Sequence, residues 1–138
     1  MLTAVRLAAW TPLVQAALRI MTGLLFLAHG TQKLLQFPAG GPPPGPDGGL
    51  PPLLLIAGLL ELVGGALFAA GFMTRITAFI LSGMMAVAYF MAHASRGFFP
   101  TTNGGDPAIL FCFIFLFFAV AGPGAFALDN LRNKPAAA

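Results

Sequence analysis

The sequence contains little charge. Only 8% of its 138 residues are Asp, Glu, Lys or Arg, whereas 58% are hydrophobic. Soluble domains carry about 25% charged residues, so a soluble enzyme with a hydrated surface is excluded. Disordered chains are polar and poor in aromatic residues, and the 14 phenylalanines of this sequence exclude that class as well. The composition is that of an integral membrane protein.

Cysteine is almost absent, and basic residues are few and scattered. Cys112 is the single cysteine, so an internal disulfide and a CxxC redox pair are both excluded. The seven Lys and Arg residues outnumber the four Asp and Glu residues and give a net charge of +3. A nucleic-acid-binding surface needs its basic residues clustered. We therefore expect no nucleic-acid partner and interpret these charges as determinants of membrane topology.

Four apolar segments predict an all-α protein, an integral membrane four-helix bundle made of one transmembrane domain over residues 1–138. A span needs roughly 20 apolar residues. The expected spans are residues 12–35, 53–70, 74–94 and 107–121. The last one would measure only about 22 Å against a hydrocarbon core of about 30 Å. Between the first two spans, residues 38–52 hold seven prolines and five glycines, which predicts a water-exposed loop.

The distribution of Lys and Arg predicts the orientation in the membrane. Four spans place both termini and the loop between the second and third spans on one side. That side carries Arg6, Arg19, Arg75, Arg132 and Lys134. The opposite side carries only Lys33 and Arg96. The positive-inside rule then places both termini in the cytoplasm of a bacterial-type inner membrane.

Polar side chains recur at helical spacing along three of the spans. The first stripe consists of Gln15, Arg19, Thr22, Phe26, His29 and Lys33, and the third span carries Ser82, Met85, Tyr89, His93 and Arg96. In the second span Ala57, Glu61 and Gly65 repeat every four residues, and Gly58 and Gly64 offer small surfaces for close helix contact. The fourth span has no polar face. The three stripes therefore predict a polar cluster inside the bundle.

The depth of the ionisable residues places them in one layer. Glu61 lies about 12 Å from the outer start of its span, His29 lies about 9 Å from the outer end of the first, and His93 lies near the outer end of the third. An ionisable residue at mid-bilayer costs about 2.5–3.5 kcal/mol, so Glu61 must be neutral or paired. A Glu–His pair meets this need and can hold a transferable proton. We therefore expect Glu61, His29 and His93 to be the catalytic candidates, beneath a roof formed by Lys33, Arg96 and residues 103–106.

Each of these residues also has a structural interpretation. Glu61 can simply join helices, His29 and His93 can be solvated near the surface, Arg19 can extend to the inner interface, and Tyr89 can belong to an aromatic belt. The alignment of the polar residues on shared stripes favours a joint functional role.

The order of these residues resembles that of a known family. The matching set is Arg19, His29-Gly30, Lys33-Leu34, Gly58, Glu61, Gly64-Gly65, Gly71, Thr74-Arg75, His93, Gly97-Phe98, Asn103-Gly104-Gly105-Asp106, Gly122-Pro123-Gly124 and Leu128-Asp129. This set resembles the DoxX family of small four-helix membrane proteins over about Val14 to Asp129. Asp106, where many members carry Glu, and the Pro-rich 38–52 insertion depart from the pattern.

The resemblance implies two kinds of function. The family takes its name from a membrane subunit of a thiosulfate:quinone oxidoreductase, and relatives are associated with methylamine dehydrogenase maturation, oxidative-stress complexes and cargo export. The first hypothesis is therefore a quinone-interacting subunit of a redox system, in which imidazole and phenol groups donate to the quinone and Glu61 relays a proton. The candidate binding residues are Arg19, Lys33, Tyr89, Arg96, Asn103 and Asp106. The alternative is a non-catalytic accessory or assembly subunit of a larger membrane complex.

Other classes are less favoured. The chain shows no redox centre of its own, so electrons would come from a protein partner. Haem held by His29 and His93 is possible in outline, whereas a His–Glu–His metal site has no spacing signature and none is expected. Four short helices leave little room for a channel.

Overall fold

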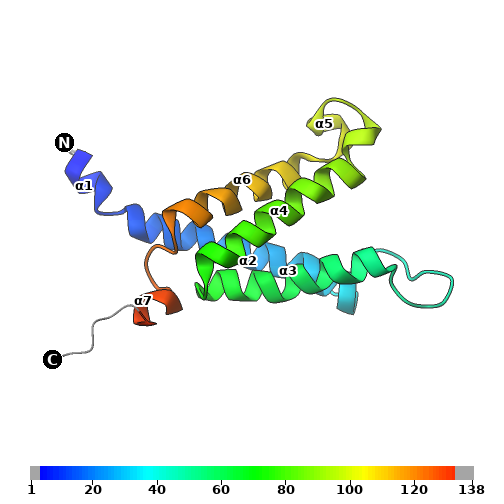
Figure 1. Cartoon of the computed structure of the whole chain (residues 1–138), viewed down its shortest axis with the longest axis horizontal. Coiled ribbons are helices and arrows are strands. Elements are labelled where there is room, and N and C mark those ends of the chain that lie inside the picture. The colour runs from blue at the N-terminus through cyan, green and yellow to red at the C-terminus, as the bar shows by residue number, and fades with distance from the viewer. Residues whose placement is uncertain (1–3, 133–138) are drawn as a thin grey trace. The chain divides into compact units, whose positions relative to one another are not determined.

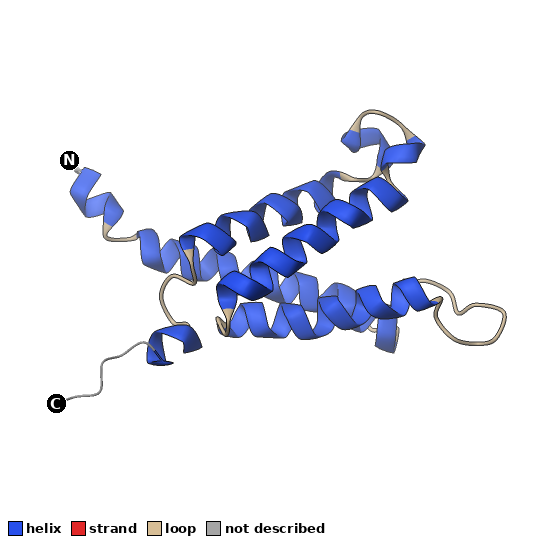
Figure 2. Cartoon of the chain, in the orientation of Figure 1, coloured by secondary structure: helices blue, strands red, loops and turns tan. Residues whose placement is uncertain are grey.

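The structure, a computed structural model, describes residues 4–132. Every regular element within these residues is helical (Figure 2). The long helices are α2 (Thr11–Leu35), α3 (Pro52–Ala70) and α4 (Thr74–Ala92), and a shorter apolar helix is α6 (Asp106–Ala121) (Figure 1). Short elements are α1 (Ala4–Ala8), η1 (Ala94–Arg96), α5 (Pro100–Asn103) and α7 (Leu128–Arg132). The all-helical membrane class predicted from the sequence is confirmed.

Three segments are long and apolar enough to cross a membrane: Val5–Leu35, Pro52–Ala70 and Thr74–Arg96. The described chain forms two compact units, one made of residues 4–74 and 123–132 and the other made of residues 75–122. Lys134, which was counted in the predicted topology, lies outside the described residues.

The first unit is built on a hairpin of α2 and α3 (Figure 1). Four buried glycines, which we call the glycine seam (Gly23, Gly30, Gly58 and Gly65), let the two backbones approach closely. A Cβ atom at Gly30 would lie 2.5 Å from the backbone nitrogen of Leu62, and one at Gly65 would lie 2.6 Å from that of Leu27. No side chain fits these positions, so the seam fixes the register of the two helices.

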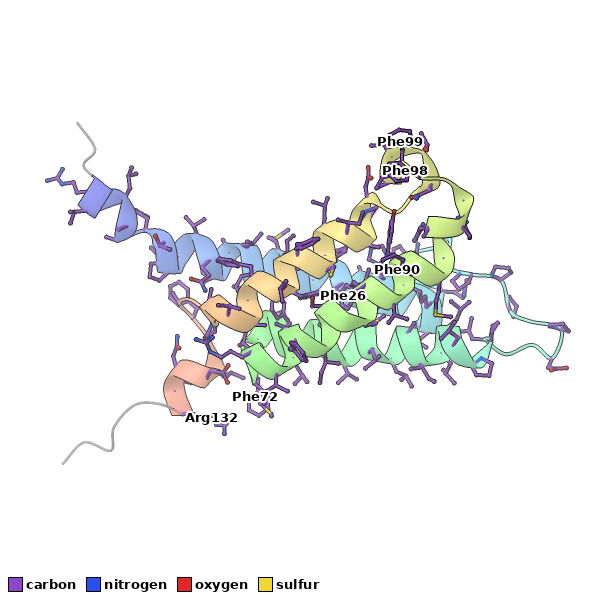
Figure 3. All side chains as sticks on the ribbon, turned by 45° about the horizontal axis from the view of Figure 1, so that its top comes forward. Phe26, Phe72, Phe90, Phe98, Phe99 and Arg132 are labelled. Atoms are coloured by element: carbon purple, nitrogen blue, oxygen red, sulfur yellow. The ribbon has the colours of Figure 1, made fainter. Side chains whose placement is uncertain are left out.

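The chain after α6 returns to the hairpin of the first unit. The backbone N–H of Ala125 donates to the carbonyl of Pro12 at 2.9 Å, and that of Asp129 donates to the carbonyl of Gly71 at 2.9 Å. At the end of this segment the Arg132 guanidinium lies 5.5 Å from the centre of the Phe72 ring (Figure 3). The short α7 is therefore attached to the turn that follows α3.

The second unit is a hairpin of α4 and α6 that run side by side (Figure 1). Near one end, Arg75 Nη1 donates to the carbonyls of Ala119 and Val120. Farther along, the Ser82 hydroxyl donates to the carbonyl of Cys112 at 2.9 Å. Polar side chains of α4 thus hold the otherwise apolar α6 through backbone carbonyls.

Candidate functional site

An ion pair between α2 and α3 is the central feature of the first unit. Lys33 Nζ lies 2.7 Å from both carboxylate oxygens of Glu61. The Glu61 side chain is 8% exposed and the Lys33 side chain 21%. The Glu61 side chain is therefore buried, whereas part of the Lys33 side chain is exposed.

The pair lies deep in the helix. Glu61 stands nine residues from each end of α3, which is about 14 Å from either end by helical rise. The backbone of Lys33 lies only two residues from the end of α2. Its long side chain brings the ammonium to the carboxylate. Gly58 makes room for this approach, because even a Cβ there would meet the Cβ of Lys33 at 3.3 Å.

The predicted partners of Glu61 were the two histidines, with Lys33 above them. The structure brings Lys33 onto the carboxylate. His29 lies on α2 one turn before Lys33, with its side chain exposed. The requirement that Glu61 be neutral or paired is thus met by a charged pair.

A second polar group lies in the other unit. Asn103 is 3% exposed, and its Nδ2 donates to the carbonyl of Gly97 at 2.9 Å and approaches the Tyr89 hydroxyl at 3.5 Å. His93 Nδ1 lies 3.2 Å from the Asn103 carbonyl, and its ring stacks on Tyr89 with centroids 6.4 Å apart. The structure therefore assembles three of the predicted residues here: Tyr89, His93 and Asn103.

The roles of the remaining candidates differ. Arg96 is exposed in η1, and Asp106 is half-buried in the first turn of α6. Arg19 is fully buried and donates to the carbonyls of Pro123, Ala125 and Phe126. Arg19 therefore fastens the returning C-terminal segment to α2, a contact that the snorkelling interpretation did not anticipate.

Within residues 4–132, no group of three His, Cys, Asp or Glu side chains is placed to hold a metal ion. The first unit offers a carboxylate paired with an ammonium. The second unit offers a phenol, an imidazole and an amide.

Comparison with known proteins assigns the chain to a family. Residues 14–94 match the model of the DoxX family. The chain belongs to the DoxX family. A similar protein is an uncharacterized protein of Haemophilus influenzae, 46% identical over 125 residues, which cover 88% of this chain and 92% of the relative.

Two further relatives are membrane proteins. The inner membrane protein YqjF of Escherichia coli is 32% identical over 84% of this chain and 89% of the relative. An uncharacterized membrane protein of Mycobacterium tuberculosis is 31% identical over 88% of this chain and 82% of the relative. No solved structure matches the chain. The resemblance to the DoxX family noted from the sequence is thus confirmed, as is the predicted location in an inner membrane.

The matched DoxX region contains the ion pair and part of the second polar group. Lys33, Glu61, Tyr89 and His93 fall within residues 14–94, whereas Asn103 follows them. The returning segment that Arg19 holds also lies beyond the matched region.

Sequence reasoning missed the contribution of Asp129 at the start of α4. Its carboxylate accepts hydrogen bonds from the backbone N–H groups of Met73 and Thr74, both at 2.8 Å. Burial by itself raises the pKa of Asp129, but these hydrogen bonds and the charge of Arg132 outweigh it and hold the pKa below its usual range. The signal in the sequence was the Leu128-Asp129 motif of the DoxX family, which was noted without a role.

Proposed function

We propose that the chain is a membrane subunit of a redox system and binds a quinone headgroup at the Lys33–Glu61 pair. The carrying observation is the asymmetric burial of that pair, with the Glu61 side chain 8% exposed and the Lys33 side chain 21% exposed. Intramembrane ionisable residues are costly and commonly mark functional pathways. The exposed part of the Lys33 side chain would give a ligand in the lipid phase access to the pair.

The residues fit a quinone in two respects. An ammonium has three N–H donors, and two of them account for the contacts with the Glu61 oxygens. The third can donate to a quinone carbonyl. The surroundings are apolar, as a quinone ring requires, because Leu34 and Leu62 flank the seam beside the pair.

The chemistry would be divided between this chain and a partner. A bound quinone supplies an acceptor for two electrons and two protons. Lys33 would hold and polarise a carbonyl, and Glu61 would hold a proton at a carboxylate oxygen and exchange it through the Lys33 ammonium. We propose that the electrons come from a protein partner.

We also propose that the four apolar helices form one bundle with both termini in the cytoplasm. The positive-inside rule supports this orientation, because Arg6, Arg75 and Arg132 fall on the side of the termini. Reporter fusions to the C-terminus and to the 38–52 loop test it. A C-terminus on the outer side would contradict the orientation.

Quinone content after purification in mild detergent tests the main proposal. Glu61→Gln keeps the size of the side chain and removes its charge, whereas Asp47→Asn makes the same chemical change in the exposed 38–52 loop. We expect wild type and Asp47→Asn to retain quinone, Glu61→Gln to lose activity in a complementation assay, and Lys33→Met to lose the quinone. Equal quinone content in Lys33→Met and wild type would refute the binding site.

The second candidate is an accessory subunit in which the pair only joins helices. It is favoured by the fact that Lys33 contacts both oxygens of Glu61, as a purely structural pair would. This role predicts that Glu61→Gln supports full complementation, whereas Glu61→Leu lowers thermal stability. The two variants therefore separate the candidates.

A further inference from the structure

The segment that joins α4 and α6 has an unusual distribution of polar and apolar groups. We call residues 93–105, which include η1 and α5, the cap segment. In this segment the polar residue Asn103 is 3% exposed, whereas Phe98 is 87% exposed and Phe99 is 63% exposed. A loop in water normally shows the reverse pattern, with polar groups outside and aromatic rings inside.

The backbone and buried polar groups of the cap segment bond to one another. Asn103 Nδ2 donates to the Gly97 carbonyl at 2.9 Å, and Asn103 Oδ1 accepts from the backbone N–H of Gly105 at 2.8 Å. The backbone N–H groups of Thr102 and Asn103 both donate to the carbonyl of Phe99 at 3.0 Å. Non-helical backbone is tolerated at membrane depth only when its polar groups are satisfied within the protein. These hydrogen bonds satisfy several polar groups of the cap segment within the protein.

The length of the second hairpin also places the cap segment close to the hydrocarbon. Helix α6 has 16 residues, about 24 Å by helical rise, whereas the hydrocarbon core is about 30 Å thick. The missing length must be supplied by the residues next to α6 or by thinning of the bilayer. At the start of α6 those residues are the cap segment.

The exposed rings of the cap segment continue the apolar surface of the helices below them. Phe90 on α4 is 72% exposed and Leu110 on α6 is 62% exposed, both near the cap end of their helices. Phe98 and Phe99 lie beyond Phe90 at the same end of the hairpin (Figure 3), and their rings meet edge to face with centroids 5.3 Å apart. The exposed Arg96 in the same segment has the chemistry to contact lipid phosphates.

From these observations we infer that the cap segment is embedded in the interfacial layer of the bilayer, with Phe98 and Phe99 inserted at the edge of the acyl chains. The partner is the lipid itself, and Arg96 faces the headgroups. This inference is independent of the quinone proposal, because it uses none of the residues of the Lys33–Glu61 pair. The cap segment thus lengthens the membrane-contacting surface of the short hairpin.

Tryptophan fluorescence in proteoliposomes tests the inference. The sequence has a single tryptophan, Trp10, so Trp10→Phe provides a background without indole emission. In that background Phe98→Trp and, separately, Phe99→Trp report on the cap segment. Both replaced rings are exposed, so neither change disturbs buried packing. The probes are phosphatidylcholine vesicles with bromine on acyl carbons near the headgroup, and the aqueous quencher acrylamide.

Two matched variants calibrate the measurement. Phe113→Trp reports a lipid-facing position, because Phe113 is a 64% exposed residue of α6. Pro44→Trp reports the exposed 38–52 loop. We expect the brominated lipid to quench Trp at 98 and 99 as strongly as Trp at 113, and acrylamide to quench them much less than Trp at 44. Quenching that follows Trp at 44 would overturn the inference, and so would protection from both quenchers, which would indicate a covering protein or a second copy.

Discussion

Replacing Lys33 by methionine removes the partner of the Glu61 carboxylate while keeping most of the volume of the stem. In the variant the carboxylate has no counter-charge, in a site where its side chain is 8% exposed. Breaking a buried pair by removing one partner leaves the other charge uncompensated. We therefore expect Lys33→Met to lower the free energy of unfolding by about 3–5 kcal/mol at pH 7.

Steric trapping in bicelles at pH 7 measures these free energies. Lys33→Arg keeps the charge and should cost less than Lys33→Met. Arg96→Met removes an exposed charge and should change stability by about 0.5 kcal/mol or less. A cost below about 0.5 kcal/mol for Lys33→Met would refute the view that Glu61 depends on Lys33.

Three further predictions concern the packing and the returning segment. Gly30→Ala should lower the unfolding free energy by about 1–3 kcal/mol through overpacking. Gly83→Ala, at an exposed position of α4, should raise it by about 0.5–1 kcal/mol. Steric trapping measures both variants, and equal effects would contradict the close packing at the glycine seam. Asp129→Ala should cost about 0.5–2 kcal/mol, as loss of a helix cap does. The folded pKa of Asp129 is lowered, so its contribution to stability is present above about pH 3.9, the unfolded pKa, and is lost as the pH falls through the folded pKa. Asp129→Asn should therefore lose less stability than wild type when thermal unfolding is followed into acid. An acid dependence identical to that of wild type would contradict the role of the Asp129 carboxylate. Arg19→Lys replaces the two guanidinium nitrogens that donate to three carbonyls by a single ammonium, which cannot reach all three. Limited proteolysis should therefore cleave residues 123–132 faster than in wild type. Unchanged cleavage would show that Arg19 does not hold the segment.

The helices could be predicted from the sequence because their signals are local. Pro12 and Pro52 stand in the first turns of α2 and α3, and Gly71 ends α3 with a φ of 69°, which is where these residues are favoured. Helix α4 ends at Ala92 rather than at residue 94, because the chain tightens into η1 at Ala94. The confirmed all-helical membrane class thus rests on hydrophobic run length and on these start and stop residues.

The candidate site was less predictable because its contacts are set by register and by side-chain reach. Lys33 and Glu61 are separated by 28 residues, and the backbone depth of Lys33 suggested a place above the carboxylate. The packing of Gly30 against Leu62 and of Gly65 against Leu27 determines which turn of α2 faces Glu61. The seven-residue spacing of Gly23 and Gly30, matched by Gly58 and Gly65, was the available signal.

The returning segment had no local signal. Asp129 accepts hydrogen bonds from residues 55 and 56 positions earlier in the sequence, and Arg19 donates to carbonyls more than 100 positions later. Backbone carbonyls are present at every residue, so no side-chain pattern indicates which ones an arginine will bind. Such contacts can be identified only once the fold is known.

The glycine seam limits how the ion pair can respond to a change of charge. With the backbones of α2 and α3 in contact at Gly30 and Gly65, sliding one helix along the other would drive side chains into the opposite backbone. The helices are therefore a fixed frame, and the moving part is the four-carbon stem of Lys33, which changes rotamer in picoseconds to nanoseconds when exposed. A proton arriving at Glu61 would release a single side chain and leave the hairpin in place.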